Sequence, residues 1–252
     1  MLGVLSRPRI AVAAGLAGAV AIAWLYLVPV SRDMYGAMTG PSAWMMQAEW
    51  DGRYFALMFL MWAVMMVGMM LPSAAPAILL FARVLNNSAQ VEAPVLRSYA
   101  FAGGYLLAWT GFSLAATLVQ WRLAEAALLS PMMEAGTPVF GAAVLVAAGL
   151  YQWTSLKQVC LSRCRSPVEF LTQNFRPGWR GALRMGVRHG LHCIGCCWVL
   201  MGLLFVGGVM QLAWIAAISI FVLLEKLAPY GVQLGRVGGA ALVLAGVAML
   251  LR

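Results

Sequence analysis

All the cysteines and histidines of this chain lie between residues 160 and 197. They are Cys160, Cys164, His189, His192, Cys193, Cys196 and Cys197. Positions separated by three, four and seven residues share one face of an α-helix. The donors between His189 and Cys196 follow that spacing, and Cys197 lies at the edge of the same face. We therefore predict that these side chains point to a common side of one helix.

Thiolate sulfur and imidazole nitrogen indicate which ions such a face could bind. They suit copper(I), zinc or an iron–sulfur unit, whereas hard ions would need carboxylates, which this helix segment lacks. Cys160 and Cys164 lie one helical turn apart and could complete a tetrahedral set if their segment folds back. The sequence therefore predicts a metal site, with copper(I) as the first choice and zinc as the alternative.

Two other interpretations of the cysteines stay open at this point. Cys193 and Cys196 have the C-x-x-C spacing of a dithiol pair, which indicates thiol–disulfide redox chemistry. Cysteine is also readily buried, and cysteines at helical spacing can simply pack against their neighbours. The odd number of cysteines and their uneven spacing argue against a disulfide framework.

The 17 methionines are a second sulfur-rich feature. Thioether sulfur is a soft, uncharged ligand for copper(I) that an apolar helix tolerates. We predict a metal path through Met58, Met61, Met65 and Met69. Other methionines fall in segments predicted to lie on the outer side, where they could collect the ion: Met34, Met38, Met45, Met46, Met132 and Met133. The alternative is that methionine, an adaptable side chain, fills the core.

The composition indicates that these residues are held by a membrane protein. The chain is 63% hydrophobic and 10% charged, with a mean hydropathy of +0.86, whereas soluble domains have about 25% charged residues. The net charge of +9 must be judged beside the apolar runs, and we expect no nucleic-acid partner. The predicted fold is all-α, one polytopic transmembrane helical bundle over residues 1–252.

The apolar runs predict about seven spans, with six as the fallback. A span needs about 20 residues, because the hydrocarbon core is about 30 Å thick and a helix rises about 1.5 Å per residue. The run from His189 to Leu224 is too long for one span, and we divide it near Gly207-Gly208 and Gln211. The other runs are Ile10–Val30, Tyr54–Ala82, Ser98–Trp121, Ala135–Leu156 and Leu227–Leu251. Leu71-Pro72-Ser73 predicts a break in the second run.

Basic residues set the predicted orientation, because short loops rich in lysine and arginine stay on the cytoplasmic side. With seven spans and the amino terminus inside, only Arg32, Arg53, Arg122 and Arg252 of the 17 basic residues fall outside. We predict a multi-pass protein of the bacterial cytoplasmic membrane with a cytoplasmic amino terminus. Its first apolar run is expected to be a retained helix rather than a cleaved signal peptide.

Two charged segments receive their own predictions. Residues 157–188 are expected to form a cytoplasmic basic loop with a short helix at the membrane surface. Ser166, Pro167 and Glu169 have the pattern of a capped helix start. Glu225 and Lys226, at the end of a predicted span, are interpreted as charges that reach towards the membrane edge, with a mutual ion pair as the alternative.

Four strings resemble a bacterial family described as predicted metal-binding integral membrane proteins, a domain of unknown function. They are MMVGMMLPSAAP, GLYQWTSLKQVCLSRCRSP, HGLHCIGCCWVLM and EKLAP. The resemblance covers much of residues 54 to 230. It implies a membrane protein that binds metal through the same seven cysteines and histidines.

The expected function is binding of a soft transition metal for its transport or delivery. The expected partners are the lipid bilayer, the metal ion, and a metal chaperone or a membrane complex. A thiol-disulfide redox protein using Cys193 and Cys196 is one alternative, and an assembly subunit of a membrane complex is another. No phosphate-binding loop, nucleophile elbow or pair of catalytic carboxylates supports hydrolytic or nucleotide-driven chemistry.

Overall fold

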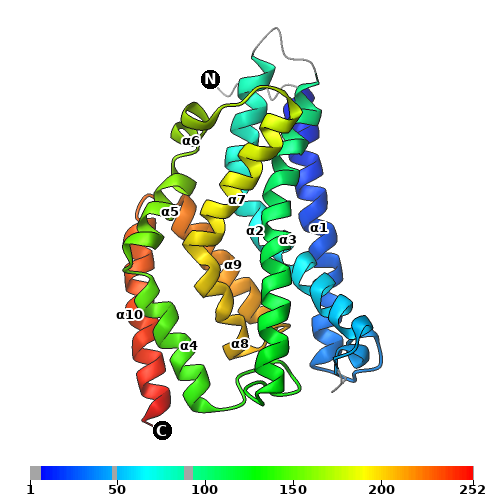
Figure 1. The fold of residues 1–252 in the computed structure, drawn as a ribbon, viewed down its shortest axis with the longest axis vertical. Helices are drawn as coiled ribbons and strands as arrows, with labels where there is room; N and C mark the ends of the chain where they lie inside the picture. Colours follow the sequence, from blue (N-terminus) through cyan, green and yellow to red (C-terminus); the bar gives the residue numbers. More distant parts are fainter. Residues whose placement is uncertain (1–6, 47–49, 88–92, 252) are drawn as a thin grey trace.

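The chain folds into a bundle of helices (Figure 1). The structure is a computed structural model that describes residues 7–46, 50–87 and 93–251. Of the residues that the structure describes, 84% are helical, and their β-structure is a single isolated bridge between Leu129 and Ala135. The all-α prediction is confirmed. Arg252 and the side chain of Met46 lie outside what the structure describes.

The helices differ widely in length, from one turn to 35 residues. Their bounds are α1 (Arg7–Met34), the 3-10 helix η1 (Pro41–Met46), α2 (Gly52–Asn86), α3 (Pro94–Glu125), α4 (Pro138–Tyr151), α5 (Ser155–Arg165), α6 (Pro167–Asn174), α7 (Gly178–Gly202), α8 (Leu204–Gly207), α9 (Leu212–Leu227) and α10 (Gly231–Leu250).

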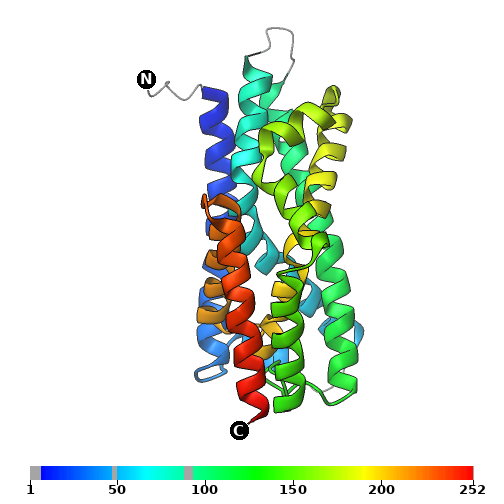
Figure 2. The same cartoon turned by 90° about the vertical axis from the view of Figure 1, so that its left-hand side faces the viewer.

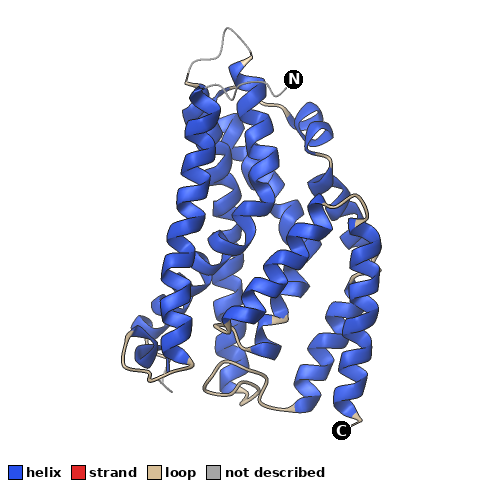
Figure 3. Ribbon diagram, turned by 180° about the vertical axis from the view of Figure 1, so that it is seen from behind, coloured by secondary structure: helices blue, strands red, loops and turns tan. Residues whose placement is uncertain are grey.

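The long helices α1, α2, α3 and α7 run side by side over most of the height of the bundle (Figures 1 and 2). The shorter α4, α9 and α10 fill only its lower part, beside α7, and the chain ends at the opposite end from its start. Loops gather at the two ends and at the level where α4 and α9 stop (Figure 3). The bundle therefore has a tall half and a short half.

Side-chain caps fix several helix starts. Asp51 accepts from the backbone N–H of Tyr54 at 2.7 Å, and Gln211 accepts from that of Trp214 at 2.8 Å. Gln211 comes shortly after Gly208, whose φ of 95° favours glycine. The long apolar run is thus divided between α8 and α9, as predicted. The helix predicted after Ser166 is present as α6, but Ser166 makes no side-chain cap bond.

The prediction of seven spans is too high. Among the described residues, five helices are long and apolar enough to cross a membrane, or up to six if the bent pair α4 and α5 counts as one span. The run predicted from Ala135 to Leu156 stops at Tyr151, where the axis turns by 64°. The run before Leu227 forms a helix of 16 residues, which reaches only about 24 Å at about 1.5 Å per residue.

The predicted break near Pro72 is also wrong, because α2 runs without interruption from Gly52 to Asn86. Pro72 has no N–H, which frees the carbonyl oxygen of Gly68, and Trp24 Nε1 donates to that oxygen at 3.3 Å. A neighbouring helix thus supplies the hydrogen bond that the proline removes.

Glycines let α3 and α7 approach closely. A Cβ at Gly104 would collide with the carbonyl oxygen of Leu183, and one at Gly186 with that of Phe101. Small residues of this kind are typical of packed helices in membranes. The contact sets the cysteine-bearing turn of α7 against Tyr105 of α3.

The outer surface of the bundle is apolar. Ile22, Leu25, Leu107, Val237 and Leu244 are between 58% and 73% exposed. Large apolar side chains facing outwards on several helices are expected where lipid replaces water. The fold is consistent with a helical membrane bundle.

Candidate metal centre

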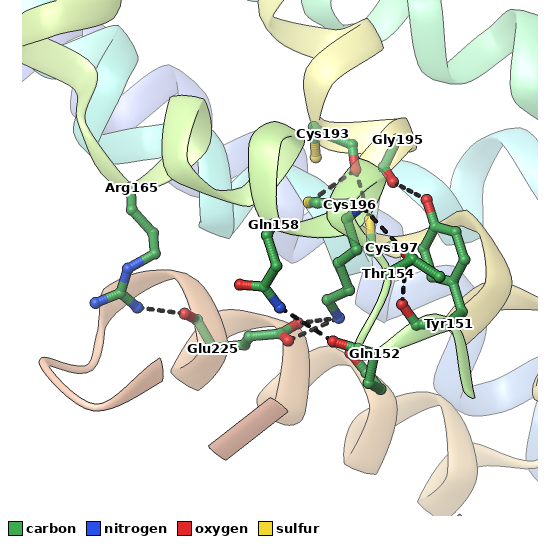
Figure 4. A network of polar contacts seen from close by, with 11 residues as sticks. Tyr151, Gln152, Thr154, Gln158, Arg165, Cys193, Gly195, Cys196, Cys197 and Glu225 are labelled. Carbon is green, nitrogen blue, oxygen red and sulfur yellow. Dashed lines mark hydrogen bonds and ion pairs between the residues drawn. The ribbon is translucent and has the colours of Figure 1, made fainter. Parts of the chain in front are cut away.

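Three cysteines of α7 lie inside the bundle with Cys164 of α5 beside them. Cys193 is 1% exposed, and Cys196 and Cys197 are fully buried. Cys164 of α5 is partly buried and packs against the same apolar core. Figure 4 shows the three α7 cysteines close to the polar residues of neighbouring helices. We refer to these four residues together as the cysteine cluster (Cys164, Cys193, Cys196 and Cys197).

The Cys193 thiol makes polar contacts with side chains of two other helices. Its Sγ atom is 2.8 Å from Nζ of Lys226 and 3.0 Å from the hydroxyl oxygen of Tyr105. Lys226, which is 5% exposed, also donates to Oγ of Ser73 at 3.0 Å. Residues of α3 and α9 thus contact one thiol of α7, and Ser73 of α2 is linked to it through Lys226.

The other two α7 thiols point back along their own helix. Cys197 Sγ donates to the carbonyl oxygen of Cys193 at 2.8 Å, and Cys196 Sγ donates to the same oxygen at 3.1 Å. Cys197 Sγ also lies 4.0 Å from Sδ of Met70 in α2.

Cys160 lies at the edge of the cluster and is partly exposed. A Cβ on Gly195 would be 2.6 Å from Cys160 Sγ, so the absence of a side chain there makes room for this thiol. Tyr151 donates to the carbonyl oxygen of Gly195 from the other side (Figure 4). The segment that carries Cys160 and Cys164 therefore folds back onto α7.

The two histidines have different surroundings. His189 is 2% exposed, and the rings of Phe101, Tyr105 and Phe170 lie 5.0 to 5.9 Å from its own. Its Nδ1 atom has no hydrogen-bond partner among the described residues. His192 is partly exposed, and its Nδ1 lies 2.6 Å from the carbonyl oxygen of Arg188.

The predicted methionine path lies in the core of α2. Met58, Met61 and Met65 are fully buried and Met69 is 2% exposed. Met58 Sδ accepts from Nε2 of Gln120 at 3.6 Å. These contacts also fit the packing interpretation. Three outer methionines are buried as well: Met34, Met45 and Met133.

Glu225 and Lys226 do not reach for the membrane edge as the sequence suggested. Glu225 is 1% exposed and pairs with Lys157 of α5, whose Nζ lies 2.7 Å from Oε1. Lys226 turns instead to Cys193 and Ser73. Consecutive residues of a helix point in different directions, which is why the two charges have different partners. Sequence reasoning missed Lys157, Tyr105 and Ser73, whose types alone give no sign of these contacts.

The seven predicted ligands do not form one assembled coordination sphere. Among the described residues, no group of three or more histidine, cysteine, aspartate or glutamate side chains is arranged to hold a metal ion. The structure buries the three α7 thiols, leaves Cys160 and Cys164 of α5 partly exposed and surrounds His189 with aromatic rings.

The comparison with known families bears on what this thiol cluster is for. A family model described as "PpoB2: Copper chaperone" matches residues 59–249, a range that contains all five cysteines and both histidines. The chain belongs to this copper chaperone family. A copper-related function is therefore supported, and the earlier resemblance to a metal-binding family is confirmed in that respect. No curated protein and no solved structure matches the chain.

Proposed function

We propose that this chain is a membrane-embedded protein that binds copper(I) at the cysteine cluster and hands it on, for transport or delivery. The observation that carries the proposal is the group of buried thiols in a chain of the copper chaperone family. Thiolate sulfur favours copper(I), and a site closed to water protects the reduced ion. Cys160 and the two histidines belong to the wider candidate set.

The proposed location is the bacterial cytoplasmic membrane. The amino terminus and the arginine-rich end of the bundle would face the cytoplasm. The exposed side chains of Arg83, Arg176, Arg180, Arg184 and Arg188 support this orientation, since Arg83 lies in the last turn of α2 and the other four lie just before α7 or in its first half. Residues 157–188, which contain most of α5 and all of α6, would then lie on or near the cytoplasmic surface.

Metal analysis of the purified protein tests the proposal. We expect about one copper per chain after reconstitution with copper(I) under reducing conditions, measured by elemental analysis. The double variant Cys196→Ser, Cys197→Ser is expected to lose most of that copper. Met201→Leu is the matched control, because Met201 is a fully buried sulfur residue on α7, one turn after Cys197.

The control variant is expected to retain its copper. A wild-type protein that holds neither copper nor zinc after reconstitution would remove the proposal. Equal copper content in the wild type and the double variant would place the site elsewhere.

One contact favours thiol–disulfide chemistry as a second candidate function. The Lys226 ammonium beside Cys193 favours the thiolate form, which is the form that attacks disulfides. Cys193 and Cys196 would become one disulfide while a partner disulfide takes up two electrons and two protons. In this case Cys196→Ser traps a mixed disulfide on Cys193 and leaves metal content unchanged, and non-reducing electrophoresis would detect the adduct.

A further inference from the structure

The thioether of Met70 lies against the cysteine cluster from the opposite helix. Met70 is fully buried, and its Sδ atom is 4.0 Å from Sγ of Cys197. It is adjacent in sequence to the last residue of the predicted methionine path, Met69, but was not part of that path.

The Met70 backbone is tied to the same hydrogen-bond network as the thiols. The Ser73 and Tyr105 hydroxyls both donate to the Met70 carbonyl oxygen, at 2.8 and 3.0 Å. Tyr105 also contacts Cys193, and Lys226 links Ser73 to Cys193. This network fixes the position of the Met70 backbone relative to the Cys193 thiol.

A thioether could supply a third ligand for a metal ion that two cysteines bind. No three histidine, cysteine or carboxylate side chains of the described residues are arranged around one point. Copper(I) is satisfied by two or three soft ligands, including thioethers, whereas zinc usually takes four ligands drawn from cysteine, histidine and carboxylate. A thioether therefore adds a donor that copper(I) uses and zinc does not.

The buried charges favour the same ion. Two thiolates and one copper(I) ion carry a net charge of −1, which the Lys226 ammonium 2.8 Å from Cys193 balances. Two thiolates and one zinc(II) ion are already neutral, so the ammonium would remain as an uncompensated buried charge, which is costly.

We propose that Met70, together with Cys193 and Cys197, binds copper(I), and that its thioether makes the site prefer copper(I) over zinc. This inference rests on the proposed function and names the ligand that sets its metal selectivity.

Paired substitutions on α2 test the inference. In Met70→Leu the side chain stays apolar and similar in volume, so we expect copper(I) affinity to fall about tenfold or more while zinc affinity stays the same. Competition with bicinchoninate reports copper(I), and competition with a chromogenic zinc chelator reports zinc. Met66→Leu is the control, because Met66 is an equally buried methionine one turn earlier, and we expect it to change neither affinity.

X-ray absorption on selenomethionine-labelled protein tests the inference without relying on a variant's folding. We expect a copper–selenium contact in the copper-loaded labelled protein and its loss in Met70→Leu. A wild type that binds copper(I) but shows no copper–selenium contact would overturn the role of Met70 and leave the cysteine site standing. Equal losses of copper(I) and zinc in Met70→Leu would overturn the selectivity. A wild type that binds no copper would instead remove the proposed function itself.

Discussion

At the residue scale, a buried ion pair between Lys157 and Glu225 connects two of the helices that carry the site. Both side chains are excluded from solvent, and the Lys157 Nζ atom lies 2.7 and 2.9 Å from the two carboxylate oxygens of Glu225. The pair joins α5 to α9. It therefore holds the segment with Cys160 and Cys164 beside the helix that carries Lys226.

Breaking one side of this pair is expected to cost more than removing both. Lys157→Met leaves a buried carboxylate without its partner, which destabilises a protein by about 3 to 5 kcal/mol. The double variant Lys157→Met, Glu225→Gln removes both charges of the pair and is expected to recover most of that loss. Thermal unfolding in detergent measures both. A single variant that melts no lower than the double variant would contradict a structural role for the pair.

The sequence predicted the donor residues of the cluster but not their partners. Helical spacing is a local property, so the common face of Cys193 and Cys196 could be inferred from a few residues. The contacts of Cys193 with Tyr105 and Lys226 join positions 88 and 33 residues away. Such contacts depend on how helices pack, and a single sequence carries no record of that packing.

At the element scale, the contact between α3 and α7 decides whether the cluster forms. The two helices touch through Gly104 and Gly186, where an added Cβ would overlap the opposite backbone. Since backbone cannot move aside as a flexible side chain can, the helices would have to separate. Tyr105 would then move away from Cys193.

Adjacent glycines of α3 allow a matched test of this contact. Gly104→Ala is expected to destabilise the protein by about 1 to 3 kcal/mol through overpacking, and to weaken copper binding. Gly103→Ala adds a Cβ where nothing lies within 4 Å, so we expect a neutral effect or a gain of up to about 1 kcal/mol. Thermal unfolding of the two variants side by side gives the comparison, and similar melting temperatures would contradict the close approach.

The element predictions failed where tertiary contacts replaced local signals. Pro72 normally ends or kinks a helix, but Trp24 satisfies the freed carbonyl oxygen and α2 continues. Apolar runs were counted as spans even where the chain bends, as between α4 and α5. Hydropathy measures composition along a run and does not register a change of direction within it.

At the scale of the whole molecule, the two ends of the bundle differ in charge and in the chain terminus that they carry. The chain starts at one end and finishes at the other (Figure 1). Exposed arginines gather at the end where the chain starts, while Arg32 and Arg122 lie near the opposite ends of α1 and α3. This polarity supports a cytoplasmic amino terminus and a carboxyl terminus on the outer side.

Reporter fusions test that orientation. Alkaline phosphatase fused after the last residue is expected to be active, because it folds only outside the cytoplasm, and green fluorescent protein at the same point is expected to stay dark. A fusion truncated after Asn174, which follows α6, is expected to give the opposite pattern. The reverse result at both positions would invert the proposed orientation.

The graded exposure of the thiols has a kinetic consequence. Cys160 and Cys164 are partly open to the surroundings, while Cys193, Cys196 and Cys197 are closed off. An ion that binds first at a partly exposed thiol can move to the buried thiols by associative ligand exchange. In each step the new sulfur–metal bond forms before the previous one breaks. Copper carried in this way never becomes a free hydrated ion, so its passage would be invisible to a chelator that traps only dissolved copper.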